Sequence, residues 1–197
     1  MADNYKTLYD SSRELFLRYD QQEMIRHFHL AYDENDLYFH ILGREARIER
    51  KTGVVTCGGE PVSFNAACPV YDILSRAEKR PTLSGEWVSI TQLGGNIASR
   101  HVEILRPALA ALNGRSAELC ALCEKLGGEK RRQGDVSYIL PLYDFFPVWV
   151  QFWEGDEEFP SRFRCLWDAN TLDFMFYETT WYAHGYLTDV FTGKEKP

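Results

Sequence analysis

Residues 37–57 read LYFHILGREARIERKTGVVTC, and this stretch decides the fold. Apolar and polar side chains alternate along it with a period of two, as in strands that bury one face. The apolar members are Leu37, Phe39, Ile41, Ala46 and Ile48. Gly43-Arg44 and Thr52-Gly53 interrupt the alternation. Connections this short join antiparallel strands, because a parallel crossover needs a dozen or more residues. The stretch predicts a three-stranded antiparallel meander with one apolar and one charged face.

Further elements are predicted on both sides of the meander. Helical spacing of apolar residues indicates helices over about 4–19, 20–28, 64–77, 102–112, 119–126 and 179–191. Asp20 and Glu23 have the spacing of a capping box, and Gly127-Gly128 is a stop signal after the fifth helix. Period-two runs indicate strands over 88–91, 136–142, 148–153 and 163–167. We expect one α+β domain over residues 1–197, with helices packed against antiparallel sheet and a C-terminal helix.

Composition narrows the class of protein. The chain has 197 residues, and 22 basic against 29 acidic side chains give a net charge of −7. With 45% hydrophobic residues, the chain can form a core and is not intrinsically disordered. The acidic balance argues against a nucleic-acid partner, which a basic surface would attract. The polar start and the lack of a long apolar run predict no signal peptide, no membrane partner and a cytoplasmic location.

The five cysteines are an odd number in a chain without an export signal, so we expect reduced thiols rather than disulfides. Cys120 and Cys123 have the CxxC spacing of a zinc or redox pair. They lie on a predicted helix, however, with Cys123 on its apolar stripe, and no second ligand pair follows. Core packing is the favoured interpretation, and no metal site is predicted.

Two motifs carry a resemblance to a known family. They are LSGEWVSITQLGG at residues 83–95 and FWEGDEEFP at residues 152–160, followed by Leu166-Trp167-Asp168. With the order of elements from about Glu14 to Leu187, they resemble an uncharacterised family of anaerobic bacteria and archaea, domain of unknown function 3786. The resemblance implies a fold and an anaerobic lifestyle. Some relatives carry an iron–sulfur module, which would imply anaerobic redox or corrinoid metabolism, but this chain has no such module.

The acidic run Asp156-Glu157-Glu158 is the first candidate site. Alternate side chains of an extended segment share a face, so Asp156 and Glu158 are the pair that can converge. Such a pair suits a hard cation or acid–base catalysis. The alternative is a polar turn between strands, with Phe159 buried and Pro160 ending the ladder. His184, on the last helix beside Trp181, is the best candidate for a base or ligand among the histidines, and an interior histidine is its alternative.

Aromatic residues crowd the last fifty positions. In the strand 148–153, Val148, Val150 and Phe152 face one side, so Trp149 and Trp153 face the other with Gln151 between them. A sheet with two apolar faces must be covered on both. Trp149, Trp153 and Trp181 are therefore candidate ligand-binding residues, although most of these rings would also suit a core.

Three function classes follow. The preferred one is a binding domain whose aromatic and acidic C-terminal region holds a small molecule or a protein partner. The second is an enzyme that uses Asp156, Glu158 and His184 as metal ligands or acid–base groups. The third is a structural interaction domain. Neither a cofactor nor an oligomeric state is assigned, and no nucleophile–base pair or phosphate-binding loop is recognisable.

Overall fold

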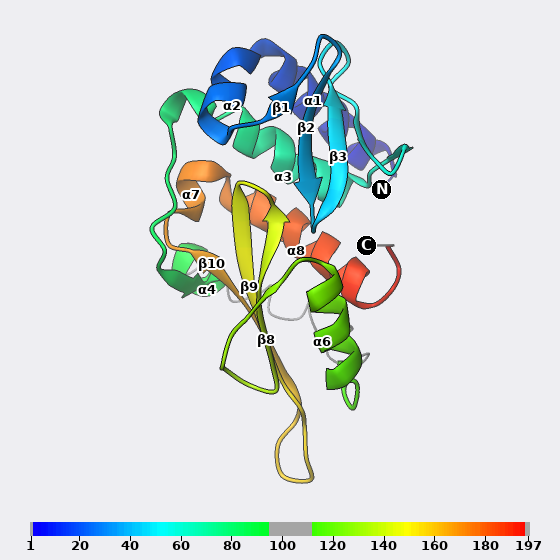
Figure 1. Cartoon of the computed structure of the whole chain (residues 1–197), viewed down its shortest axis with the longest axis vertical. Helices are drawn as coiled ribbons and strands as arrows, with labels where there is room; N and C mark the ends of the chain where they lie inside the picture. Colours follow the sequence, from blue (N-terminus) through cyan, green and yellow to red (C-terminus); the bar gives the residue numbers. More distant parts are fainter. Residues whose placement is uncertain (1, 95–111, 196–197) are drawn as a thin grey trace.

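The computed structural model describes residues 2–94 and 112–195. The helices are α1 (Ala2–Arg18), α2 (Gln21–Phe28), α3 (Phe64–Leu74), the short 3₁₀ helix η1 (Ala77–Lys79), α4 (Ile90–Gly94), α6 (Ser116–Lys125), α7 (Thr171–Phe174) and α8 (Tyr177–Phe191). The strands are β1 (Ala31–Tyr32), β2 (Asp36–Ile41), β3 (Arg44–Glu49), β4 (Val55–Cys57), β5 (Glu60–Pro61), β6 (Trp87–Ser89), β7 (Glu129–Lys130), β8 (Val136–Tyr143), β9 (Phe146–Trp153) and β10 (Arg162–Asp168). The helix predicted over 102–112, with His101 beside it, falls almost entirely outside the described residues. The α+β class is confirmed (Figure 1).

The predicted meander is confirmed as β2–β3–β4. Leu37 opposes Ile48 and Ala46 opposes Cys57, all with buried side chains. The turn between β2 and β3 is Leu42-Gly43, where both residues have positive φ, 48° and 74°. That geometry matches the right-handed twist of the strands that the turn joins. The apolar face of the meander packs on α1 and α3, which lie behind it in Figure 1.

A second set of strands continues the sheet in the order β5-β4-β3-β2-β8-β9-β10-β6, with β1 and β7 pairing beside β2 and β8. All pairings of the described strands are antiparallel. The two halves meet where Ile41 opposes Tyr143. The strands predicted over 136–142, 148–153 and 163–167 are confirmed as β8, β9 and β10.

The strand predicted over 88–91 is wrong in its second half, because β6 ends at Ser89 and α4 begins at Ile90. The cause is local. The backbone N–H of Ser89 donates to the Gln92 side chain at 2.8 Å, and the Gln92 N–H lies 3.4 Å from Ser89 Oγ. This reciprocal pairing is a capping box, which starts a helix.

Two other helix signals are present, although the capping box predicted at Asp20 and Glu23 forms only in part, because the Glu23 carboxylate pairs with Arg26. The Asp20 carboxylate accepts the backbone N–H of Gln22 at 2.7 Å and so caps α2. After α6, Gly127 has a φ of 76°, and the N–H of Gly128 donates to the carbonyl of Cys123 at 2.8 Å. This is the left-handed helix ending that glycine favours. The third predicted helix ends early, at Leu74, and η1 follows it.

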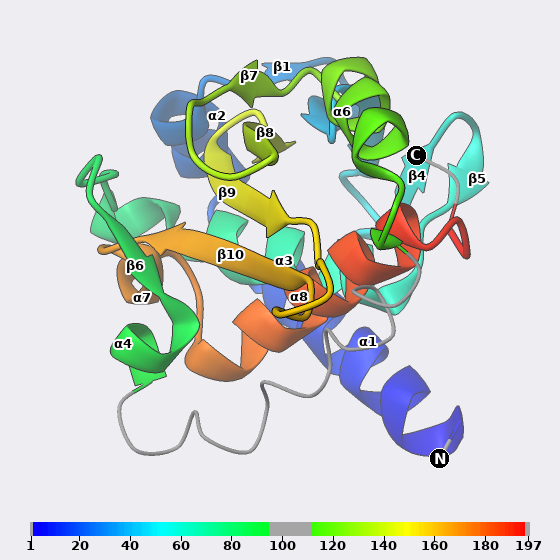
Figure 2. The ribbon, with the colours of Figure 1, turned by 90° about the horizontal axis from the view of Figure 1, so that it is seen from below.

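Helices α6 and α8 pack on one face of the second set of strands (Figure 2). The Tyr138 hydroxyl of β8 donates a hydrogen bond to the Glu124 carboxylate of α6. In β10, Phe163 contacts Phe191 of α8, and Trp167 contacts His184 of α8. Helix α8 also packs along α3, and α3 packs along α1. The three helices form a layer behind the sheet, and the candidate site lies in this layer.

Candidate functional site

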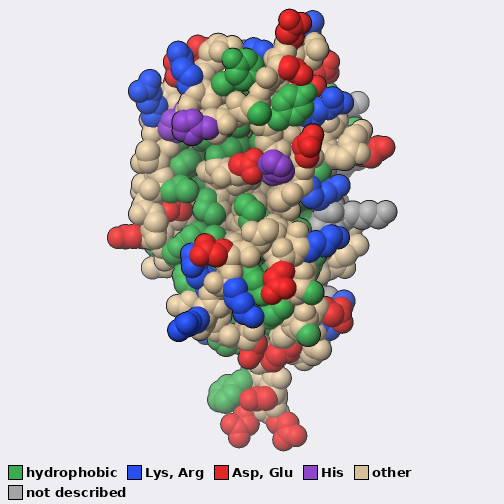
Figure 3. Space-filling model, in the orientation of Figure 1, with side chains coloured by type: hydrophobic (Ala, Val, Ile, Leu, Met, Phe, Trp, Pro, Cys, Tyr) green, Lys and Arg blue, Asp and Glu red, His purple; other side chains and the backbone are tan. Residues whose placement is uncertain are grey.

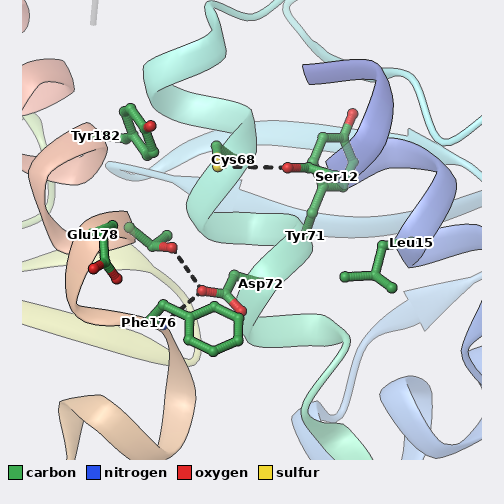
Figure 4. A pocket seen from close by; sticks show the side chains of 9 residues that line it. Ser12, Leu15, Cys68, Tyr71, Asp72, Phe176, Glu178 and Tyr182 are labelled. Atoms are coloured by element: carbon green, nitrogen blue, oxygen red, sulfur yellow. Dashed lines mark hydrogen bonds between the residues drawn. The ribbon is translucent and has the colours of Figure 1, made fainter. Parts of the chain in front are cut away.

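A pocket of about 330 Å³ opens between helices α1, α3 and α8, and we call it the α1–α3–α8 pocket (Figure 4). Its volume is within the range of small-molecule sites. The lining residues are Ser12, Leu15, Cys68, Tyr71, Asp72, Phe176, Glu178, Thr179 and Tyr182. They come from α1, from α3 and from the start of α8. These segments are far apart in the sequence, so only the folded helix layer brings the residues together.

Tyr71 forms a rigid part of the wall. Its Oη donates to the carbonyl of Gly53 at 2.6 Å and lies 3.2 Å from the hydroxyl of Tyr9. The ring is buried and packs against Phe16. Burial raises the pKa of Tyr71 well above its ordinary value of 10, so the hydroxyl stays neutral. The phenol therefore presents ring carbons, rather than a free polar group, to the pocket.

Asp72 is a charged wall residue whose carboxylate is already occupied. One oxygen accepts the backbone N–H of Phe176 and the hydroxyl of Thr179, both at 2.7 Å. The other accepts Nε of Arg76 at 3.1 Å. The Arg76 guanidinium also lies 4.1 Å from the centre of the Phe176 ring. Asp72 thus ties α3 to the start of α8 and has little capacity left for a ligand.

Cys68 supplies the pocket's only thiol among the described residues. Its sulfur lies 3.9 Å from Ser12 Oγ, and the pair is drawn in Figure 4. Burial raises the pKa of Cys68 to about 12, so the thiol is protonated at neutral pH. A protonated thiol is a poor nucleophile. Cys68 therefore contributes a small, weakly polar surface to the wall.

The rim of the pocket combines apolar surface with one free carboxylate. Leu15 is 41% exposed and Phe176 is 59% exposed, so both present apolar surface beside the opening. Glu178 is also exposed, and no described residue pairs with its carboxylate. The pocket thus offers an apolar wall and a single negative charge at its mouth.

The acidic run predicted as a site forms the tip of the β9–β10 hairpin. Asp156 Oδ1 accepts the backbone N–H groups of Glu158 at 2.9 Å and Phe159 at 2.7 Å. These amides lower the pKa of Asp156 below its ordinary value. Asp156 therefore builds the turn. Within the turn interpretation, the expectation that Phe159 is buried is wrong, because Phe159 is 67% exposed.

The tip projects from the body of the molecule in Figure 1, and its acidic side chains are at the bottom of Figure 3. His184 lies instead inside the helix layer, where α8 crosses the body. No described contact joins Asp156 or Glu158 to His184. The structure therefore does not bring these three candidates into one site, and a catalytic role for them stays a prediction.

His184 is a buried residue with unusual surroundings. Its ring lies 5.1 Å from Trp167 and 5.8 Å from Trp181, measured between ring centres. Among residues 2–94 and 112–195, neither ring nitrogen finds a hydrogen-bond partner, and neither does Trp167 Nε1. Burial lowers the pKa of His184 from 6.5 to about 4. His184 is thus a neutral interior histidine among aromatic rings, and Trp181 contacts it rather than the acidic tip.

Trp149 and Trp153 lie on the face of β9 opposite Val150 and Phe152, as the alternation predicts. Trp149 packs edge-on against Trp87 at 5.7 Å and donates from Nε1 to Ser137 Oγ at 3.0 Å. Both indoles are partly exposed. A ligand role for these residues stays a prediction.

Sequence reasoning missed the α1–α3–α8 pocket. The helical spacing in α1 places Leu15 and Phe16 on one apolar stripe, but Phe16 is buried whereas Leu15 is exposed beside Phe176, and no local signal separates the two. It also missed a pair between Asp144 and His40. Asp144 Oδ2 lies 2.9 Å from His40 Nδ1 and accepts the backbone N–H of His40 at 2.7 Å. These two residues border a separate hollow of about 340 Å³ beside β1 and β2.

Other predicted features can be placed as well. All five cysteines are free, and Cys120 and Cys123 lie on α6 as expected, with Cys123 buried. Among the described residues, no group of three or more His, Cys, Asp or Glu side chains is arranged to hold a metal ion. None of the described helices is long and apolar enough to cross a membrane.

Comparison with known protein families gives a match over most of the chain. The family model "Domain of unknown function (DUF3786)" matches residues 20–190, which is most of the chain. The chain belongs to this family. The match confirms the family resemblance carried by the two motifs. No curated protein and no solved structure matches this DUF3786 chain.

Proposed function

We propose that this DUF3786 protein binds a small, largely apolar molecule in the α1–α3–α8 pocket. The proposal rests on one observation: three polar side chains of the pocket wall already form hydrogen bonds within the protein. Tyr71, Asp72 and Thr179 already bond within the protein. Apolar contact is therefore the main interaction that the wall can offer, and burial of apolar surface contributes about 25 cal/mol per Å².

The charge at the mouth selects among apolar ligands. The Asp72 carboxylate is balanced by Arg76, whereas Glu178 keeps an unpaired negative charge at the rim. An anionic group on the ligand would lie near Glu178 and be repelled. The pocket therefore favours a neutral or cationic ligand over an anionic one.

Binding fits the pocket better than catalysis. Its thiol is protonated, the Asp72 carboxylate already accepts three hydrogen bonds, and its buried phenol donates to a carbonyl. The acid–base alternative with Asp156, Glu158 and His184 would need a separate site that joins the hairpin tip to α8. The link to anaerobic redox or corrinoid metabolism, implied by the resemblance, stays a prediction, as does the cytoplasmic location.

A matched pair of fluorescent dyes tests the proposal. 1-Anilinonaphthalene is neutral, and its 8-sulfonate carries the same rings with one negative charge. When the neutral dye is titrated with the purified protein, its fluorescence should rise and saturate at one dye per chain. The sulfonate should bind about tenfold more weakly, which corresponds to about 1.4 kcal/mol. Glu178→Gln should narrow this difference without weakening the neutral dye.

Two leucines of α1 provide a matched control. Leu15→Arg places a charged side chain at the mouth of the pocket and should weaken the neutral dye by about tenfold or more. Leu17 is similarly exposed but does not line the pocket, so Leu17→Arg should leave binding unchanged. The proposal is wrong if no saturable binding occurs, or if both variants bind like the unmodified protein.

A further inference from the structure

One face of the second set of strands has no described helix on it. Strand register places Gln151 opposite Arg164 and Trp153 opposite Arg162, so all four side chains share a face. Helices α6 and α8 cover the other face, which carries Val150 and Phe152. Gln151 itself is buried on this face, whereas Trp149, Trp153 and Arg164 are partly exposed and Arg162 is exposed. We call the surface formed by Trp149, Trp153, Arg162 and Arg164 the Trp–Arg face.

The charges of the Trp–Arg face are not balanced within the described chain. The guanidinium carbons of Arg162 and Arg164 each lie 5.8 Å from the centre of the Trp153 ring. Neither guanidinium forms a salt bridge or hydrogen bond with a described residue. A guanidinium has five N–H donors that suit carboxylate oxygens. The face therefore presents unpaired donors beside partly exposed aromatic rings.

The complementary chemistry is at the end of the same hairpin. Residues 154–160, which we call the acidic tip, lie between the end of β9 at Trp153 and the start of β10 at Arg162. Glu157 and Glu158 are exposed, and no described side chain pairs with either carboxylate. Phe159 exposes its ring beside them. Asp156 is committed to the turn. The tip thus offers two free carboxylates and one aromatic ring.

We propose that the acidic tip of a second copy of this chain docks on the Trp–Arg face. Glu157 and Glu158 would pair with Arg162 and Arg164, and Phe159 would pack near Trp153. Because tip and face belong to one hairpin, two copies related by a two-fold axis can exchange both contacts at once. Such a self-complementary contact closes as a dimer.

The charge of the chain favours the acidic tip over a nucleic acid as the partner of the Trp–Arg face. The whole chain has a net charge of −7, which would repel a single-stranded nucleic acid even though aromatic and arginine side chains can bind one. The tip presents its charges locally and in matching number. One hairpin buries less surface than a stable interface of about 800 Å² per partner, so we expect dissociation at about micromolar concentration or higher.

Sedimentation equilibrium of the full chain from about 1 to about 500 µM tests the proposal. The unmodified protein should show a reversible monomer–dimer equilibrium that weakens at high salt. The double variant Arg162→Glu/Arg164→Glu should be monomeric, and so should Glu157→Arg/Glu158→Arg, because each places like charges in both contacts. An equimolar mixture of the two variants should restore a dimer, since both contacts then join opposite charges.

Lys51→Glu/Lys79→Glu is the control, because it changes the net charge as much as the arginine variant but lies away from the hairpin. It should dimerise like the unmodified protein. The proposal is overturned if the unmodified protein is monomeric throughout, if the arginine variant still dimerises, or if the mixture does not. Binding of a single-stranded oligonucleotide to a monomer through Arg162 and Arg164 would also overturn it. None of these outcomes depends on the α1–α3–α8 pocket.

Discussion

The carboxylate of Asp72 on α3 accepts the backbone N–H of Phe176 at 2.7 Å, at the point where α8 begins. The same oxygen accepts the hydroxyl of Thr179. An acceptor with a negative charge at a helix N-terminus satisfies free amides and interacts favourably with the positive end of the helix dipole. Here the cap comes from another helix, so it fixes α8 against α3 and holds the α1–α3–α8 pocket open between them.

Asp72→Ala should therefore destabilise the fold. The substitution removes a cap and leaves Arg76 without its carboxylate, and hydrogen bonds to charged groups contribute about 1.5–3 kcal/mol. We expect the free energy of unfolding to fall by about 2–3 kcal/mol in urea titrations. Asp173→Ala, an exposed acid on α7, should change it by about 0.5 kcal/mol or less. Equal effects would show that Asp72 is not a structural cap.

His184 should make stability depend on pH. Its folded-state pKa of about 4 is below the unfolded value of 6.5, so the unfolded chain binds more protons between these values. The contribution is fully present above pH 6.5 and is lost as pH falls toward 4. Between pH 7.5 and pH 5 the free energy of unfolding should drop by about 2 kcal/mol.

His184→Phe removes the titrating group while keeping a ring between Trp167 and Trp181. Urea titrations of this variant at pH 7.5 and pH 5 should show a much smaller difference than the unmodified protein does. Carboxylates titrate mainly below this range, so they contribute equally to both proteins. An unchanged pH dependence would show that His184 is not buried in its neutral form.

The thiols should differ in reactivity. Burial raises the pKa of Cys68 and Cys123 to about 12 and raises that of Cys165 further. Cys120 is partly exposed and should react first with a disulfide reagent in the native protein. In denaturant without reductant, all five should react. A count below five, or zinc lost on replacing Cys120 and Cys123, would contradict the assignment of free thiols.

Asp156 and Glu158 should behave differently when replaced. Asp156→Ala removes the acceptor of two backbone amides, so the hairpin tip should be cleaved faster by a nonspecific protease. Glu158→Gln leaves those bonds intact and should not change the cleavage rate. Neither variant should change the melting temperature much, because the tip is exposed. Equal cleavage rates would show that Asp156 does not order the turn.

The fold was largely predictable because alternation acts over neighbouring residues. The period of two in residues 37–57 fixed which side of β2 and β3 is buried, and it also placed Trp149 and Trp153 opposite Phe152. The capping pair Ser89 and Gln92 overrode the period-two run over 88–91, since two side-chain bonds can end a strand locally.

The pocket was not predictable in the same way. Ser12, Cys68 and Tyr182 meet only because three helices pack together, and no short-range pattern encodes that packing. The candidates Asp156 and His184 were grouped because aromatic residues surround both in the sequence. In the fold, the hairpin carries Asp156 outward while α8 carries His184 into the core.

Amide chemical-shift mapping with neutral 1-anilinonaphthalene tests the central claim most directly. Titration of ¹⁵N-labelled protein should perturb the amides of Ser12, Cys68, Thr179 and Tyr182, which line the α1–α3–α8 pocket. In Leu15→Arg, the same signals should move only at about tenfold higher dye concentration or above. Perturbations confined to Trp149 and Trp153, or no saturable perturbation at all, would contradict a ligand site between α1, α3 and α8.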